Sequence, residues 1–273
     1  MRHAHALFGL TSGIFVCRRM RLFTIRRHFS TAVLSRRPGL PDAAQVECCM
    51  SDTELDAVFR EYETLAAQVD GLFERVRAQF PAEVTCTAGC SDCCHAMFDL
   101  PLVEAMALNR AFNNRFDFGA ARSAVLEAAG DADRAATRLK RRYFQRAKQG
   151  ATDDEILREA ARDRVRCPLL GQDNRCVLYD QRPLTCRLYG VPTAIHGKAH
   201  ACGKCGFVPG GAYPTVALDR IQDKLAELSR RLAAAVGSRY RELHTVYVPV
   251  SMALLTRYDD AYLGVGPAPK NQE

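Results

Sequence analysis

The chain has 273 residues, of which 48% are hydrophobic and 25% charged, a composition that excludes disordered and fibrous proteins. No run of 18 consecutive apolar residues is present, so the sequence predicts no transmembrane helix and no membrane partner. The formal net charge is +7, but residues 1–49 hold eight Arg against one Asp and one Glu, which leaves only +1 for the remainder. A body this close to neutral argues against a nucleic-acid partner.

Residues 1–49 form a basic N-terminal extension that we set apart from the fold. It contains three Arg pairs among Ser, Thr and apolar residues, a composition typical of organellar transit peptides. Met50 is followed by Ser51 and Glu54, which form a capping box for a helix. We therefore favour a start site placed too early, with a transit-like peptide and a genuine basic arm as the alternatives.

Several segments of the body carry helical signals, namely apolar residues at steps of three and four, helix-capping residues, or Pro at the first position. Gly130 falls inside one of them, so that segment is either one long helix or two shorter pieces. In chain order, we expect helices over residues 51–80, 99–113, 119–149, 152–164, 215–236 and 249–262.

Residues 167–213 are rich in Gly, Pro and Cys and show no clear period, which predicts loops with short strands or turns. Residues 244–250 are β-branched and favour a short strand or an extended entry. No alternation of strands and helices is visible, which excludes a doubly wound sheet. We therefore expect a mostly α fold with little β, a single helical domain over residues 50–265 wrapped around irregular Cys-rich loops, and a tail at 266–273.

Nine of the twelve cysteines lie between positions 86 and 205, in three groups of short spacing. The first group has the pattern C-x3-C-x2-C-C, the second C-x8-C-x9-C, and the third C-x2-C. Short loops of this kind can bring several sulfur atoms to one metal ion. The predicted metal ligands are Cys86, Cys90, Cys93, Cys94, Cys167, Cys176, Cys186, Cys202 and Cys205.

A site made only of thiolates selects zinc or an iron–sulfur cluster over Mg²⁺, Ca²⁺ or Mn²⁺. Nine thiols suffice for two four-ligand sites, or for one site and several reactive cysteines. The alternatives are buried unreactive thiols and disulfides. Clustered cysteines argue against the first, and a large helical body argues against the second. A radical S-adenosylmethionine enzyme and a thioredoxin-like pair share parts of the spacing, but both need β/α architecture that the sequence does not predict.

Two arginines lie among the predicted ligands. We expect Arg182 and Arg187 to offset the negative charge of the thiolates and to fix the loop that contains Cys186. The alternative is a simple turn at Pro183 with solvated charges. His95, His196 and His200 flank the cysteine loops and are alternative ligands, although capping or surface histidines are more common.

Two further features are charged. Glu104 falls early in a predicted helix, where a carboxylate stabilises the helix N-terminus, and a catalytic role is the alternative. The basic run over residues 138–146 predicts a solvated helix face, with a docking surface for an acidic partner as the alternative.

The first cysteine group resembles the C-x3-C-x2-C-C opening of the YkgJ-type cysteine-cluster proteins. The second group, with Cys167-Pro, Tyr179, Arg182-Pro183 and Cys186-Arg187, is similar to the same family's second signature. The resemblance spans about residues 85–190 and implies zinc or iron chelation. Flagellin lysine N-methylases have a similar cluster domain, but this sequence shows no S-adenosylmethionine loop.

These observations predict a cytoplasmic metal-binding protein that holds zinc or an iron–sulfur cluster. In a structural version, the metal fixes the loops and the protein binds a protein partner. In an enzymatic version, one coordination position or one thiol is free, and the cluster helps to modify a protein side chain. The number of protein ligands and the presence of a cleft distinguish the two versions.

Overall fold

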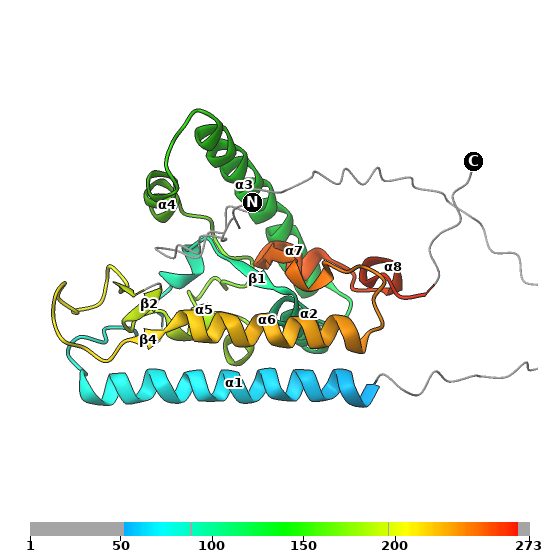
Figure 1. Cartoon of the computed structure of the whole chain (residues 1–273), viewed down its shortest axis with the longest axis horizontal. Helices are drawn as coiled ribbons and strands as arrows, with labels where there is room; N and C mark the ends of the chain where they lie inside the picture. Colours follow the sequence, from blue (N-terminus) through cyan, green and yellow to red (C-terminus); the bar gives the residue numbers. More distant parts are fainter. Residues whose placement is uncertain (1–51, 88, 196, 267–273) are drawn as a thin grey trace, which may run out of the picture.

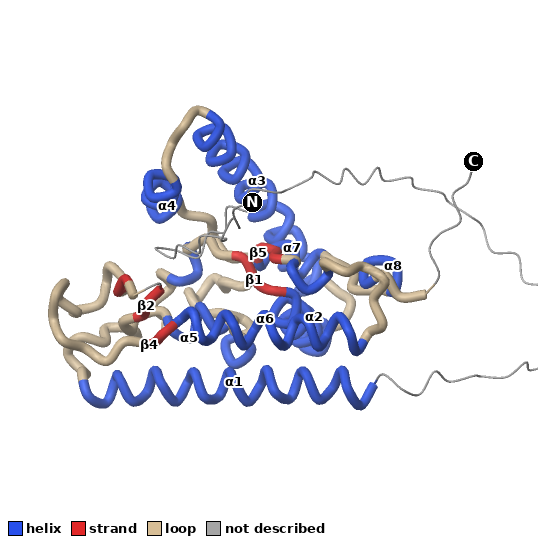
Figure 2. Tube along the Cα trace, in the orientation of Figure 1, coloured by secondary structure: helices blue, strands red, loops and turns tan. Residues whose placement is uncertain are grey.

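The computed structural model describes residues 52–87, 89–195 and 197–266 (Figure 1). Helices dominate this part of the chain, and its strands form only a two-stranded and a three-stranded sheet (Figure 2). The predicted mostly α fold with little β is therefore confirmed. None of the helices described combines the length and the apolar character that a membrane span requires. The basic extension, Ser51 and His196 lie outside the described residues.

The largest hydrophobic core contains the apolar faces of α1 (Asp52–Gln79) and α6 (Leu218–Ala235). These two helices lie side by side (Figure 1). Their apolar faces are the ones that the periodicity predicts, and Pro81 follows the end of α1. Arg231 on α6 reaches the carboxylate of Glu61 on α1 at 2.6 Å. The fully buried residues of this layer include Val58, Val69, Leu102, Val103, Leu184, Leu225, Leu228 and Leu232.

A short antiparallel ribbon joins β1 (Asp99–Pro101) to β5 (Tyr247–Pro249), with Leu100 opposite Val248. The helix expected from residue 99 therefore begins later, at α2 (Leu102–Arg115), with Pro101 as its N-cap. Leu100 is fully buried, so pairing in the ribbon and core packing both favour the extended conformation there.

The region of residues 119–164 forms one long helix and one short helix that project from the rest of the molecule (Figure 1). Helix α3 (Ala120–Lys148) is continuous, which decides between the two alternatives left open at Gly130. The predicted capping box of Thr152 starts α4 (Asp153–Arg162). The basic run is not simply solvated, because Arg146 pairs with Glu159 of α4 at 2.9 Å.

Residues 167–213 consist mainly of loops, as predicted, with four short elements. These elements are a 3-10 turn η2 (Tyr179–Gln181), helix α5 (Leu184–Leu188), and strands β2 (Thr193–Ile195) and β3 (Lys198–His200). Strand β2 pairs antiparallel with β3 and parallel with β4 (Val216–Ala217). The sequence analysis missed α5, which starts directly after Pro183 and contains Cys186.

The prediction of one continuous C-terminal helix over residues 249–262 is wrong. The segment forms α7 (Val250–Leu255) and α8 (Asp260–Leu263), separated by extended residues. The side-chain amide of Asn109 on α2 donates to the carbonyls of Ala253 and Thr256, which satisfies the end of α7. The 3-10 turn η3 (Leu243–Thr245) likewise shortens the strand expected over 244–250.

Candidate metal centre

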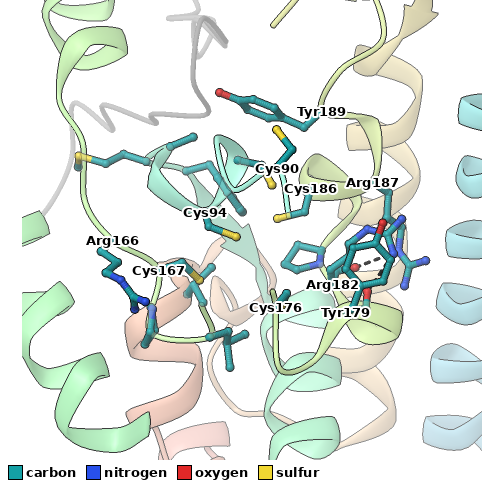
Figure 3. A pocket seen from close by; sticks show the side chains of 18 of the residues that line it. Cys90, Cys94, Arg166, Cys167, Cys176, Tyr179, Arg182, Cys186, Arg187 and Tyr189 are labelled. Carbon is teal, nitrogen blue, oxygen red and sulfur yellow. Dashed lines mark hydrogen bonds between the residues drawn. The ribbon is translucent and has the colours of Figure 1, made fainter. Parts of the chain in front are cut away.

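Seven of the nine predicted ligands line one cavity of about 660 Å³. They come from the loop before β1, from the loop after α4 and from α5, and the C-terminal half of α1 closes one side. Figure 3 shows the sulfur atoms of Cys94 and Cys186 turned toward each other, with Arg182 and Arg187 to one side. The seven are Cys86, Cys90, Cys93, Cys94, Cys167, Cys176 and Cys186.

Backbone hydrogen bonds tie the first two cysteine groups together. The 3-10 turn η1 (Cys93–His95) follows the first loop, and the carbonyl of Cys94 accepts a 2.7 Å bond from the N–H of Cys167. The carbonyl of His95 accepts a second bond from Val165, so the two segments run together although about 70 residues separate them. Cys94 is thereby held beside Cys167.

A tight chain reversal positions Cys167 and Cys176, the first two cysteines of the second group. The N–H of Val177 donates to the carbonyl of Leu169 at 2.9 Å, and Leu170 forms an isolated bridge with Cys176. Leu169 is almost completely buried, which anchors this reversal in the core. Cys167 and Cys176 are consequently brought to the same side of the cavity.

Helix α5, which contains Cys186, is held in place by a buried carboxylate. Glu104 of α2 is 2% exposed and accepts a 2.6 Å bond from the backbone N–H of Leu184 and a 3.2 Å bond from the hydroxyl of Tyr62 on α1. Burial raises the pKa of Glu104 to about 7, and the two hydrogen bonds oppose that shift. Glu104 thus joins three helices, one of which contains Cys186.

The hydrogen bonds of Arg182 and Arg187 go to Asp70 and to backbone carbonyls. Both guanidinium groups pair with Asp70 of α1, and Arg187 also donates to the carbonyls of Arg182 and Asp180. Arg182 lies 4.0 Å from the ring centre of Tyr179. These bonds can fix the loop that contains Cys186, whereas any effect on a metal remains a prediction.

The thiols of the cavity influence one another electrostatically. Cys93 has a lowered pKa because the thiols of Cys186 and Cys94 donate hydrogen bonds to its sulfur. The pKa of Cys186 and that of Cys94 are raised, first by those bonds and then by burial. Burial also raises the pKa of Cys167 to about 12. The lowered pKa of Cys93 and the raised pKa of Cys186 and Cys94 have their shared hydrogen bonds as a common cause, and a metal cation bound to these sulfurs would displace their protons.

Cys176 and Cys86 lie toward the edges of this group. Burial raises the pKa of Cys176, and the charge of Arg182 opposes the shift. Burial raises the pKa of Cys86 to about 11, and the charges of Cys90, Cys93 and Cys202 act in the same direction. Cys86 therefore lies between the cavity thiols and the third cysteine group.

Cys202 and Cys205 do not line the large cavity. They lie on a turn in which the N–H of Lys204 points at the sulfur of Cys202 at 3.4 Å and the N–H of Cys205 donates to the carbonyl of Cys202. Cys202 lines a second cavity, of about 390 Å³, together with Asp92 and His200. The structure thus divides the nine predicted ligands between two neighbouring places.

The histidine alternatives have different surroundings. The ring Nδ1 of His95 lies 3.0 Å from the carbonyl of Ser91, which is a local contact within the first cysteine loop. His200 lines the second cavity, and burial lowers its pKa. His196 is outside the described residues, so the structure does not place it.

The cavity wall also contains an ion pair that the sequence did not predict. Lys140 of α3 lies 2.7 Å from both carboxylate oxygens of Asp99 on β1, and both residues line the cavity, as does Asp70 of α1. Burial raises the pKa of Asp99. Asp70 and Asp99 belong to ordinary helical or extended patterns, so no local signal marks them, and Lys140 was noted only as part of the basic run over residues 138–146.

The cavity fits a metal in its chemistry, because its polar lining is rich in soft sulfur donors. Within residues 52–87, 89–195 and 197–266, however, no three Cys, His, Asp or Glu side chains are drawn together tightly enough to form a ready-made metal-binding group. Zinc or iron binding is therefore still a prediction. No protein-family model, no curated protein and no solved structure matches the chain.

Proposed function

We propose that this chain is a metal-binding protein whose cavity thiolates hold zinc or an iron–sulfur cluster. The observation that carries the proposal is the convergence of seven cysteines from separate segments of the chain on one cavity. Chance burial of thiols would scatter them among the core residues. Here they line one cavity, and the sulfur of Cys93 accepts hydrogen bonds from the thiols of Cys186 and Cys94.

The burial of these cysteines favours ligands over packing residues. A cysteine that only fills a core is usually completely buried. Only Cys94 among the nine is buried, and the other eight are partly accessible to solvent. All nine are free thiols, so disulfides do not account for the clustering among the described residues. The proposal includes a cytoplasmic location, because thiolates that serve as metal ligands have to stay reduced.

The role of the metal depends on which metal is bound. Zinc held by four thiolates would fix the loops on either side of the cavity and contribute directly to folding. An iron–sulfur cluster would instead supply electron transfer. In both cases, the chain's own residues hold the ligands: Glu104 and Asp70 anchor α5, and the carbonyl of Cys94 anchors Cys167. Arg182 and Arg187 would lie beside the negative charge of such a centre.

A second candidate function is that of a metal-dependent enzyme that modifies a protein side chain. The size of the cavity favours it, because about 660 Å³ is within the range of small-molecule sites and exceeds what a closed four-thiolate site needs. The motifs that resemble YkgJ-type proteins support chelation for either candidate. We accordingly include membership of that family in the proposal.

The test is to purify the full chain without oxygen, record its visible spectrum and measure zinc, iron and sulfide per chain. We expect either a colourless protein with bound zinc or a brown protein with matched iron and sulfide. Replacing Cys176 by Ser is expected to lower the metal content, whereas replacing Cys48 by Ser, outside the predicted ligands, is expected to leave it unchanged. A wild-type protein with no metal and all of its cysteines reactive would overturn the proposal.

Adding azide to the Co²⁺-loaded protein separates the two candidates. Cobalt held by four thiolates has no free coordination position, so its visible spectrum is expected to stay unchanged when azide is added. A spectral change that saturates with azide would indicate an open position and favour the enzyme. An unchanged spectrum would favour the structural metal-binding protein.

A further inference from the structure

The contacts among the nine thiols are densest around Cys93, and Cys86 connects this set to the turn that contains Cys202. Cys93 is the centre of a first group, because its sulfur accepts hydrogen bonds from the thiols of Cys186 and Cys94. Cys94 also interacts electrostatically with Cys167 and Cys176, and these two interact with each other. The first group therefore comprises Cys93, Cys94, Cys167, Cys176 and Cys186.

The second group is built where the first cysteine loop meets the turn of residues 202–206. The hydroxyl of Thr85 donates to the carbonyl of Lys204 at 2.6 Å, and the N–H of Gly206 donates to the carbonyl of Glu83 at 2.7 Å. These two bonds fasten the turn directly beside Cys86. Thr85 and Lys204 are 119 positions apart in the sequence, so tertiary structure brings them together.

Gly206 makes this approach possible. A Cβ atom at this position would lie 3.0 Å from Cα of Glu83 and 3.4 Å from the carbonyl oxygen of Ala82. Both neighbours are backbone atoms that cannot rotate away, so a side chain would push the turn outward. The absence of a side chain at position 206 keeps the turn against the segment that leads to Cys86.

Both cysteine pairs of the second group have the local form of metal-binding turns. In the C-x2-C turn, the N–H of Lys204 points at the sulfur of Cys202, which is the kind of bond that stabilises a thiolate ligand. In the C-x3-C loop, the N–H of Cys90 donates to the carbonyl of Thr87 and closes a turn. Cys86 interacts most strongly with Cys90, and then with Cys93 of the first group and with Cys202 of the turn.

We propose that the chain holds two separate metal centres, and that Cys86, Cys90, Cys202 and Cys205 form a closed zinc site distinct from the five-thiol group. Two short cysteine loops facing each other supply the four ligands that structural zinc requires. The site would fix the turn of residues 202–206 to the end of α1 and shape one edge of the large cavity. This inference rests on the proposed function, because it assigns its ligands.

The experiment uses the metal-free, reduced full chain loaded with ¹¹³Cd²⁺ as a probe for thiolate sites. The wild-type protein is expected to give two resonances and two tightly bound cadmium ions per chain. The double variant Cys202→Ser/Cys205→Ser is expected to lose one resonance and about half of the cadmium. The reciprocal variant Cys167→Ser/Cys176→Ser is expected to lose the other resonance.

A second measurement needs no variant and so avoids any failure to fold. The cadmium-loaded wild-type protein is treated with increasing chelator and an alkylating reagent, and the modified cysteines are identified by mass spectrometry. We expect Cys86, Cys90, Cys202 and Cys205 to become reactive together, separately from the other five. Joint release of all nine would overturn the two-centre arrangement while leaving metal binding intact.

The remaining outcomes are also decisive. Retention of both resonances in the Cys202→Ser/Cys205→Ser variant would overturn the inference alone. A wild-type chain that binds no cadmium tightly would overturn both the inference and the proposed function.

Discussion

The carboxylate of Glu104 and the backbone N–H of Leu184 lie 2.6 Å apart, although 80 positions separate them in the chain. Leu184 begins α5, and Cys186 is two residues further on. Because Glu104 also accepts a bond from Tyr62, one buried side chain fixes the short cysteine helix against both α1 and α2. The position of a predicted metal ligand thus depends on a residue that does not contact metal.

Replacing Glu104 by Ala is expected to destabilise the protein by about 2–5 kcal/mol, since it leaves a buried N–H and a buried hydroxyl without an acceptor. Glu104→Gln retains a carbonyl oxygen and is expected to cost clearly less. Urea unfolding followed by circular dichroism measures both variants. Equal losses for the two variants would contradict a role for the acceptor.

Glu104 also predicts how stability depends on pH. Its pKa in the folded protein is about 7, above the value of about 4.5 expected when unfolded, because burial disfavours the charged form. The folded state therefore binds the proton more tightly, and this contribution is complete below pH 4.5 and lost as the pH rises to about 7. The total is about 3 kcal/mol, from the usual conversion of a pKa difference.

The measurement compares the unfolding free energy of the wild-type protein with that of Glu104→Gln between pH 4.5 and 8. The difference between the two proteins should change across pH 4.5–7 and become constant above it. The Gln variant is the matched control, because it has no titrating group at that position. A constant difference over the whole range would show that Glu104 does not titrate there.

Asp70 is predicted to anchor the same helix from the other side. Asp70→Asn removes the charge that pairs with both Arg182 and Arg187, and Arg187 is only 8% exposed. We expect a loss of about 1–3 kcal/mol in unfolding free energy, because a largely buried guanidinium loses its charged acceptor.

A surface pair on the same helix supplies the control for this prediction. Glu74 pairs with Arg77, and both side chains are more than half exposed. Glu74→Gln is expected to change the stability by no more than about 0.5 kcal/mol, as is usual for exposed ion pairs. If Asp70→Asn costs as little as Glu74→Gln, the anchoring role is wrong.

Local sequence signals predicted the parts of the fold that depend on nearby residues. Thr152 and Glu155 form the expected capping box, and Pro81 follows the end of α1 as expected. The break between α7 and α8 was missed because Asn109, more than 140 positions away, satisfies the carbonyls at the end of α7. Periodicity reports the apolar face of a helix but not a partner from another segment.

The same distinction applies to the candidate site. Cysteine spacing identified the thiols that line the cavity, since short spacing is itself a local signal. Asp70 was not identified, because its partners Arg182 and Arg187 are more than 110 positions away and helix periodicity gives an Asp on α1 no special meaning. The proposed division of the nine thiols likewise depends on the contact between Thr85 and Lys204, residues 119 positions apart that no sequence pattern connects.

A final prediction concerns Gly190, which lies so close to Cys86 that a side chain at position 190 would require Cys86 to shift. Its φ is +106°, and an added Cβ would lie 3.0 Å from Cβ of Cys86. Gly210 is the matched control, with φ of +83° but no atom within 4 Å of an added Cβ. Both changes to Ala are expected to cost about 1–2 kcal/mol of backbone strain. Only Gly190→Ala should also displace Cys86 and weaken cadmium binding, measured by competition with a chelator. Equal cadmium affinity in the two variants would mean that Cys86 is not a ligand in the proposed zinc site.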